Sequence, residues 1–487
     1  MKKTIAILLS LFALTAFAQK HEITIRLEKP NQEKLYIAQH FRDELRLVDS
    51  ARLAKGGKYL FNGKARLQKG IYALVDASGK KAITDFTIDG GAKFTLYFDS
   101  TLKASGVKVT GSEANRHMFE YIAKNDVARS RARQLDKDKK SKDEKVRKAA
   151  EQEMESLSKE MVAYEKDMAE KNKEFYFFRL QQIFGGPEVP ESVADKAVYY
   201  RTHYWDGIDL KDHSLIYTPD LFNKMNYYFF GVLYYADADT ICHHADRVLH
   251  SIDNDPVMLQ YFLEFIMPKY YRSTKNIGWD QVWCHLVREF YLSGKCTFAT
   301  PADIANKRQT CEFLERSLIG AMGAELVMAD TNQSSNSEDW ISSHRLPNKY
   351  VILWFWDPDC HHCQEQTATL ITLYDSLAAA HNPIFEVYAV GYESDVAKWK
   401  RYVKEHNLPF INVGGPNVNI DYQEAYNIHG APTMIILNAD RQIIMNKTLP
   451  TNSILPFIRE YEKSHPEQAN RPPSRWQQMG MTRKAGN

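Results

Sequence analysis

The hydrophobic and polar positions change their pattern twice along the chain. Short segments that alternate apolar and polar residues, separated by glycine-containing turns, predict a sandwich-like antiparallel β domain over residues 19–111. Helical spacing replaces this alternation over residues 112–325 and predicts a helical domain. Residues 326–463 alternate strand-like with helix-like segments. The predicted fold class is therefore multidomain, with an N-terminal antiparallel β domain, a central all-α region and a C-terminal α/β domain.

The helical region begins with one long amphipathic pattern. No proline or glycine interrupts residues 112–179. Apolar residues recur there every three or four positions, which places them on one face of a helix: Val146, Ala150, Met154, Leu157, Met161, Tyr164 and Met168. The stretch Asp136–Arg147 has a single apolar residue and predicts the link before this helix. Prolines beyond residue 180 predict a series of shorter helices.

The C-terminal region contains the strongest strand signal. Tyr350–Trp356 is almost continuously apolar, as expected of a strand that is buried on both faces. Residues 357–359 end this strand, and residues 360–363 begin a helix. A second strand is predicted at Phe385–Gly391, and a later strand-turn-strand segment leads into a closing helix near residues 453–461. We expect residues 464–487 to form a disordered tail.

The N-terminal residues and the net charge indicate where the protein acts and which classes of function are excluded. Lys2 and Lys3, the apolar stretch 4–14 and Ala16-Phe17-Ala18 have the pattern of a secretory signal peptide over residues 1–18. We therefore expect a periplasmic or otherwise extracytoplasmic protein, and no later stretch approaches the length of a membrane span. The net charge of +2 gives no electrostatic argument for nucleic-acid binding.

Six cysteines are few for 487 residues, so their positions matter more than their number. Four lie in the helical region: Cys242, Cys284, Cys296 and Cys311. These four allow three sets of pairings, and we consider Cys284–Cys296 and Cys296–Cys311 as candidate bridges. Cys242-His243-His244 looks like a metal site, but three consecutive residues of a regular helix cannot all face one ion. We favour a polar patch or a structural disulfide there.

The remaining two cysteines, Cys360 and Cys363, are separated by two residues at the predicted start of a helix. Unpaired backbone N–H groups and the positive end of the helix dipole stabilise a thiolate at that position. One helical turn brings Cys363 close enough to attack a mixed disulfide formed by Cys360. We therefore expect Cys360 to be the nucleophile and Cys363 to be the buried resolving thiol.

The segment Trp354 to Cys363 resembles the thioredoxin-fold signature Phe-Trp-x-x-x-Cys-x-x-Cys, closest to extracytoplasmic proteins of the ResA/TlpA type. The resemblance implies thiol–disulfide exchange without a cofactor, with protein thiols and disulfides and an unidentified redox partner as partners. It also implies supporting roles for Trp356 and for a cis proline, which Ala431-Pro432 resembles. The β-rich start and the helical region resemble multidomain proteins that are common in Bacteroidota.

Two positions depart from thioredoxin itself. The buried acid that assists proton transfer there corresponds to Trp354 in this chain. The residues between the cysteines are His361 and His362, and a His before the second cysteine resembles the periplasmic disulfide-introducing oxidases. A His close to the Cys360 sulfur stabilises its thiolate, so we expect a reduction potential above the ~−270 mV of thioredoxin. The alternative is that both His side chains are exposed and affect only solubility.

Three other functions compete with this interpretation. A thiol peroxidase has a Thr three residues before its nucleophile, whereas Asp357 stands there in this chain. A zinc site would need four converging ligands, which residues 360–363 rarely provide because they are contiguous, and we expect no metal. A thioredoxin-like domain can also be a non-catalytic interaction module of the cell envelope. Reductase, oxidase and isomerase share the motif, so the sequence leaves the direction of exchange open.

Overall fold

The computed structural model describes residues 21–63, 67–271, 276–331, 340–379, 384–392 and 395–471. The predicted signal peptide lies outside these residues. The chain divides into two compact units, Met1–Tyr234 and Tyr235–Asn487. The helical region, which the hydrophobic pattern presents as one domain, is therefore shared between the two units. None of the described helices is long and apolar enough to cross a membrane.

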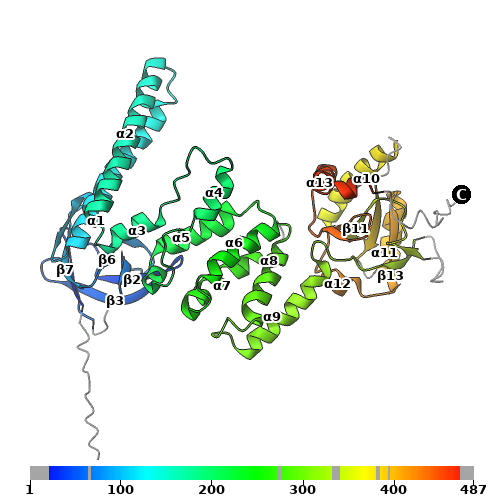
Figure 1. Ribbon diagram of the computed structural model, residues 1–487, viewed down its shortest axis with the longest axis horizontal. Helices are drawn as coiled ribbons and strands as arrows, with labels where there is room; N and C mark the ends of the chain where they lie inside the picture. Colours follow the sequence, from blue (N-terminus) through cyan, green and yellow to red (C-terminus); the bar gives the residue numbers. More distant parts are fainter. Residues whose placement is uncertain are drawn as a thin grey trace, which may run out of the picture. The chain divides into compact units, whose positions relative to one another are not determined.

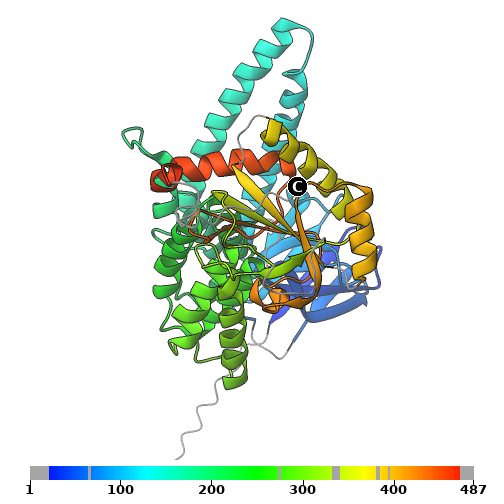
Figure 2. The ribbon, with the colours of Figure 1, turned by 90° about the vertical axis from the view of Figure 1, so that its right-hand side faces the viewer.

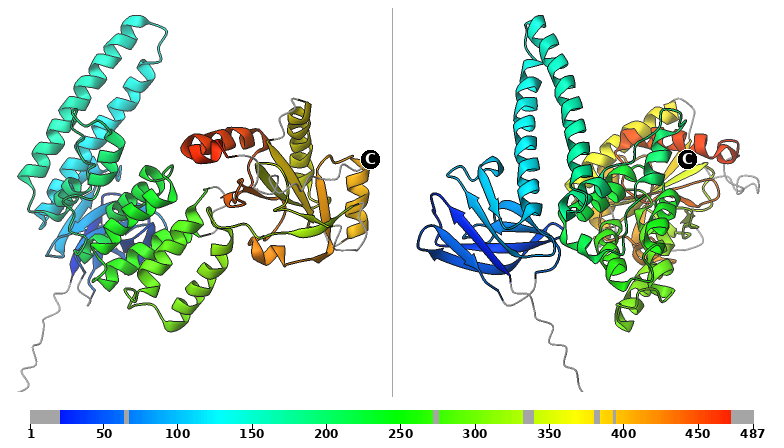
Figure 3. Two further views of the ribbon diagram at one scale, coloured as in Figure 1. Left: turned by 45° about the vertical axis from the view of Figure 1, so that its right-hand side comes forward. Right: turned by 60° about the vertical axis from the view of Figure 1, so that its left-hand side comes forward.

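The first unit begins with an eight-stranded sheet in the order β6-β5-β2-β3-β4-β1-β7-β8 (Figure 3, right). The strands are β1 Glu22–Leu27, β2 Lys34–Phe41, β3 Glu44–Ala54, β4 Lys58–Phe61, β5 Gly70–Val75, β6 Ala82–Ile88, β7 Lys93–Phe98 and β8 Val107–Thr110. Alternate residues of β1, namely Ile23, Ile25 and Leu27, are buried, as the alternating pattern predicts. One pair departs from the predicted antiparallel arrangement, because β1 and β7 run parallel.

Two long antiparallel helices, α1 Glu113–Asp138 and α2 Glu144–Lys171, follow the sheet and project from it (Figure 1). The predicted link at residues 136–147 contains the turn between them. Of the predicted apolar stripe on α2, only Ala150 is fully buried, because α2 packs mainly against α1 and not into a core. The shorter helices of this unit are α3 Tyr176–Phe184, α4 Lys196–His203 and α5 Pro219–Tyr227.

The second unit begins with four helices: α6 Ala238–His250, α7 Pro256–Tyr270, α8 Trp279–Leu286 and α9 Pro301–Leu314. Aromatic and aliphatic side chains fill their interior, and nine residues of α7 are buried. A π-helical turn, Val287–Leu292, continues α8. Pro256 and Pro301 are the first residues of α7 and α9, where a missing backbone N–H costs no hydrogen bond.

A seven-stranded sheet in the order β10-β9-β13-β12-β11-β14-β15 follows these helices (Figure 2). Its strands are β9 Val327–Asp330, β10 Ile341–Ser342, β11 Tyr350–Trp356, β12 Phe385–Gly391, β13 Ile411–Val418, β14 Thr433–Leu437 and β15 Ile443–Met445. Its helices are α10 His361–Ala379, α11 Val396–Glu405, α12 Tyr422–Ala425, α13 Thr451–Ser464 and α14 Pro466–Ala469. β11 lies between parallel β12 and antiparallel β14.

All seven residues of β11 are buried, which confirms the prediction of a strand covered on both faces. Its even-numbered side chains pack with residues of α10, α11 and α13, and its odd-numbered side chains pack with Tyr422 and Ala425 of α12. The sheet is therefore the middle layer, with α10, α11 and α13 on one face and the short helix α12 on the other. This arrangement holds the C-terminal end of β11, where Cys360 follows, in a fixed position.

Part of the expected disordered tail has a defined structure. Residues 466–469 form α14, and Gln468 is buried, with its Nε2 donating to Asp440 Oδ2 at 3.1 Å. This prediction was wrong for residues 464–471 because the contact with Asp440 fixes them to the turn between β14 and β15. The rest of the expected tail lies outside the described residues.

Candidate active site

Cys360 occupies the capping position before α10. Its carbonyl oxygen accepts the first helical hydrogen bond, from Gln364 N at 3.0 Å. Its Sγ accepts a hydrogen bond from the backbone N–H of Cys363 at 3.3 Å. A helix has unsatisfied N–H groups at this end, and one of them is directed at the Cys360 sulfur. The Cys360 side chain is partly exposed, so the sulfur is accessible to a reaction partner.

The turn between β11 and α10 is held by its own polar groups. The Asp357 carboxylate accepts a hydrogen bond from the backbone N–H of Asp359 at 2.7 Å. The Asp357 carbonyl oxygen accepts a hydrogen bond from the backbone N–H of Cys360 at 3.2 Å. The Asp359 carboxylate forms an ion pair with Lys398 of α11. These bonds fix the direction in which the chain enters α10, and with it the position of Cys360.

Cys363 lies behind Cys360 and is fully buried in the core between β11 and α10. Burial raises the pKa of the Cys363 thiol to about 12, with further contributions from the Cys360 thiol and the Asp357 carboxylate, against the backbone N–H of Asp357. The reduced Cys363 therefore remains protonated near neutral pH. The two thiols are thus chemically unequal: one is accessible and capped by an N–H group, and the other is buried and neutral.

The peptide bond between Ala431 and Pro432 is cis, as the resemblance implies. It directly precedes β14, whose Thr433 pairs with Phe355 of β11. This pairing brings the Ala431 carbonyl oxygen to 3.8 Å from Cys360 Sγ. Two segments 71 positions apart in the sequence thus meet at the sulfur.

The two histidines between the cysteines are exposed, 78% for His361 and 80% for His362. His361 Nε2 lies 3.2 Å from one oxygen of Glu365, and His362 Nδ1 lies 3.6 Å from the other. Both rings thus face the same carboxylate on the solvent side of α10. Glu365 follows them by four and three residues, a helical spacing that could have identified this partner from the sequence.

Trp354 and Trp356 are both fully buried in the core that contains Cys363. Trp354, which stands where thioredoxin has an acid, donates from Nε1 to Thr367 Oγ1 of α10 at 3.1 Å. Trp356 packs its ring against Tyr402 at a centroid distance of 5.4 Å. The region next to Cys363 is therefore apolar and tightly packed, apart from Asp357.

Metal-type donors converge elsewhere in the chain. Among the described residues, Cys284, Cys311 and Glu315 bring three potential metal-ligand atoms together, one from each side chain. These three atoms lie within 4.8 Å of one another. In the Cys242-His243-His244 segment, Cys242 and His244 are buried whereas His243 is exposed, so the three side chains do not share a face. Burial raises the pKa of the Cys242 thiol to about 12.

Comparison with known proteins assigns a family to each region. Residues 348–443 match a family described as thioredoxin-like. Residues 21–118 and 136–315 match two domain families of unknown function, DUF4369 and DUF5106.

Among curated proteins, the soluble secreted antigen MPT53 of Mycobacterium tuberculosis is 30% identical over 95 residues, which are 20% of this chain and 51% of the relative. The chain thus spans about half the length of the curated relatives it matches.

Two solved structures align with nearly their full length. A thioredoxin-like protein from Bacteroides caccae is 18% identical, with a TM-score of 0.45 and coverage of 58% of this chain and 98% of that one. The thioredoxin domain of a thiol-disulfide oxidoreductase from Bacteroides vulgatus is 19% identical, with a TM-score of 0.25 and coverage of 29% and 96%. By this family match, residues 348–443 form a thioredoxin-like domain, and a β domain and a helical region that match families of unknown function precede it.

Proposed function

We propose that this protein catalyses thiol–disulfide exchange through Cys360 and Cys363. The observation that carries the proposal is the unequal placement of the two sulfurs. The Cys360 sulfur is accessible and accepts a hydrogen bond from a backbone N–H group at a helix N-terminus, whereas Cys363 is buried one helical turn further along. A nucleophilic thiol needs access and a stabilised thiolate, and a resolving thiol needs proximity and protection from other partners.

In the reducing direction, the Cys360 thiolate attacks one sulfur of a client disulfide. One client thiolate leaves and takes up the proton that Cys360 released when its thiolate formed, and a mixed disulfide forms between Cys360 and the client. Cys363 then loses its proton and attacks Cys360 Sγ, and the second client thiolate leaves and is protonated. The client gains two electrons and two protons, and the protein ends with a Cys360–Cys363 disulfide. The oxidising direction is the reverse of these steps.

The buried proton of Cys363 is the difficult part of this sequence. Its raised pKa means that attack on the mixed disulfide requires a base near the sulfur. Trp354 and Thr367 bond to each other and supply none. We propose that the Asp357 carboxylate, whose charge acts on Cys363, accepts this proton directly or through water.

Trapping of clients tests the function. The Cys363→Ala variant should accumulate mixed disulfides on Cys360, because the resolving thiol is absent. The matched control is the double variant Cys360→Ser, Cys363→Ala, which should accumulate none. Equal adduct levels in the two variants, or no adducts in either, would contradict the exchange mechanism and favour an interaction module. Consumption of peroxide by the reduced protein would instead support the peroxidase alternative.

We also propose that the exchange takes place outside the cytoplasm, with protein thiols and disulfides as clients and a separate redox partner. The predicted signal peptide over residues 1–18 supports this proposal. N-terminal sequencing of the exported protein should give a start near Gln19. A retained Met1 on the mature protein would contradict it.

A further inference from the structure

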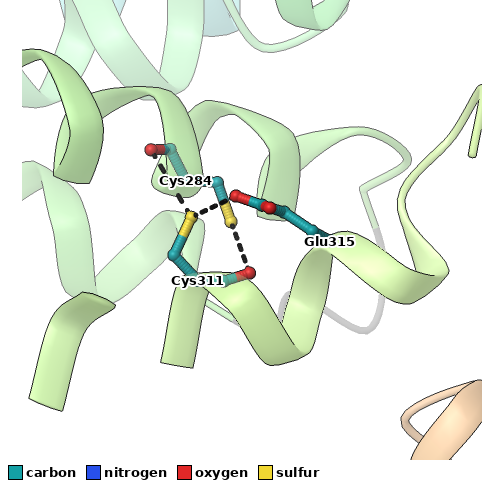
Figure 4. A group of neighbouring side chains, drawn as sticks. All are labelled: Cys284, Cys311 and Glu315. Carbon is teal, nitrogen blue, oxygen red and sulfur yellow. Dashed lines mark hydrogen bonds between the residues drawn. The ribbon is translucent and has the colours of Figure 1, made fainter. Parts of the chain in front are cut away.

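A second pair of cysteines lies in the helical part of the second unit (Figure 4). Cys284 belongs to α8 and Cys311 to α9, and their exposed fractions are 0% and 2%. Cys284 Sγ lies 3.8 Å from the Cys311 carbonyl oxygen, and Cys311 Sγ lies 3.8 Å from the Cys284 carbonyl oxygen. The two sulfurs lie within 4.8 Å of each other. The side chains therefore face each other across the contact between the two helices.

Glu315 is the third member of this group. Its Oε1 accepts a hydrogen bond from Cys311 Sγ at 3.0 Å, and the same oxygen forms an ion pair with Arg288. Zinc requires four converging ligands, and in the described part of the chain the cluster contains three donors. The charge of one of these donors, the Glu315 carboxylate, is already neutralised by the Arg288 guanidinium group. A disulfide needs only the two sulfurs, which are already neighbours.

We propose that Cys284 and Cys311 form a structural disulfide between α8 and α9, while Cys242 and Cys296 remain thiols. This pairing differs from both candidates considered from the sequence, Cys284–Cys296 and Cys296–Cys311. The inference goes beyond the proposed function, because it does not involve the Cys360–Cys363 pair.

The bond forms by exchange with a low-molecular-weight disulfide such as oxidised glutathione. Cys311 loses its proton, and its thiolate attacks one sulfur of the small disulfide, which expels one thiolate. The Cys284 sulfur then loses its proton and attacks the mixed disulfide at Cys311, which expels the second thiolate. The two released protons protonate the two leaving thiolates, so two protein thiols and one small disulfide give one protein disulfide and two small thiols.

The surroundings favour a stable bond over a reactive one. The Cys284 thiol, burial and the Glu315 carboxylate all raise the pKa of Cys311 above its ordinary value. A thiol of high pKa is a poor leaving group, so reduction of the bond is disfavoured. The cysteines are 27 positions apart, and a crosslink of that span restricts the unfolded chain. The bond would therefore stabilise the helical part of the second unit.

Peptide mapping tests the pairing. The full chain is prepared with Cys360→Ser and Cys363→Ser, equilibrated with oxidised glutathione, unfolded in guanidinium together with the alkylating reagent, and digested with trypsin without reduction. Trypsin separates the four remaining cysteines into the peptides 225–247, 276–288, 296–307 and 309–316. We expect a linked pair of 276–288 and 309–316, and alkylated cysteines in the other two peptides. Alkylation of both Cys284 and Cys311, or a link from either one to Cys242 or Cys296, would overturn the proposal.

Thermal unfolding of the same protein gives a second readout. Reductant should lower its apparent Tm by about 5–10 °C. The matched variant Cys296→Ser, also buried, should keep this dependence on reductant, and Cys311→Ser should lose it. An unchanged Tm on reduction, or retention of one zinc ion per chain with Cys284 and Cys311 unlinked, would overturn the proposal. The comparison of reduced with oxidised protein needs no substitution at either cysteine.

Discussion

The two active-site thiols differ in their surroundings, and that difference predicts different reactivity. Cys363 is fully buried, and its pKa is raised to about 12, so its thiolate is scarce below that pH. Cys360 is partly exposed and accepts the N–H of Cys363. Alkylating reagents react with the thiolate and require access to the sulfur.

In the reduced protein, iodoacetamide at pH 8 should therefore modify Cys360 and leave Cys363 as a thiol. Both cysteines fall in the tryptic peptide 350–398, so fragment ions of that peptide locate the adduct. Unfolding in guanidinium should abolish the difference and serves as the control. Modification of Cys363 at the rate of Cys360 in the folded protein would contradict its assigned burial.

The histidines between the cysteines interact mainly with Glu365 and solvent. Charges that are about four-fifths exposed are screened and contribute less than about 1 kcal/mol. We expect replacement of His361 and His362 by Ala to lower the reduction potential, because a His close to the Cys360 sulfur favours its thiolate, but by no more than about 20 mV. Equilibration with glutathione measures it. A rise in potential would contradict this sign, and a fall of more than about 60 mV would contradict the solvent-facing placement.

At the scale of elements, the edge of the first sheet shows how α1 is attached to it. β6 is an edge strand, and the backbone N–H and C=O groups of its Thr87 point away from the neighbouring strand β5. Asn115 of α1 fills that side: its Oδ1 accepts the N–H of Thr87 at 2.7 Å, and its Nδ2 donates to the Thr87 carbonyl at 2.8 Å. The amide side chain thus replaces a neighbouring strand at this position.

Replacement of Asn115 by Ala should lower the free energy of unfolding by about 2–4 kcal/mol. Both residues are buried, so the substitution leaves an N–H and a C=O of Thr87 without partners or water. Urea denaturation of the full chain, followed by far-UV circular dichroism, measures the change. Asn125→Ala on the same helix removes a part-buried bond to the Tyr121 carbonyl and a contact with the Tyr121 side chain, and should cost less than about 1 kcal/mol. Equal losses in the two variants would contradict this role of Asn115.

How far the sequence predicts these elements depends on the range of the interactions that form them. β11, the start of α10 and the segment before β14 follow from local hydrophobic runs and a short motif. The parallel pair β1–β7 and the bonds between Asn115 and Thr87 join residues that are distant in the chain, and no local pattern indicates them. β13 was missed because Gly414, Gly415 and Pro416 interrupt its strand pattern.

The same limit applies to the candidate site. The spacing of Cys360 and Cys363 predicts the chemistry, because the sequence itself places both sulfurs on one helical turn. The supporting role of Ala431-Pro432 was expected only through a family resemblance, since 71 positions separate Ala431 from Cys360. The face-to-face arrangement of Cys284 and Cys311 depends on how α8 packs on α9, which the sequence pattern does not specify.

At the scale of the whole molecule, the thioredoxin-like domain shares its compact unit with helices α6 to α9. Lys447, just after β15, pairs with Asp280 of α8 at 2.7 Å, and the two side chains are only 14% and 8% exposed. Nearby, Asn446 Nδ2 donates to the Ser317 carbonyl at 2.9 Å, and the backbone of Gly320 bonds to Ile443. The segment before the predicted domain boundary at residue 326 thus packs against the β15 edge of the sheet.

The pair formed by Lys447 and Asp280 provides a test of this connection. Lys447→Met keeps the aliphatic part of the side chain but leaves the buried Asp280 carboxylate without its cation, which typically costs about 3–5 kcal/mol. We expect thermal unfolding of the second unit to move to lower temperature by roughly 6 °C or more, as measured by calorimetry of the full chain. Glu424→Gln is the matched control, because its pair with Arg316 is half exposed and should contribute less than about 1 kcal/mol. If Lys447→Met behaved like this control, the thioredoxin-like domain would not depend on α8 for its stability, and the two parts of the unit would unfold independently.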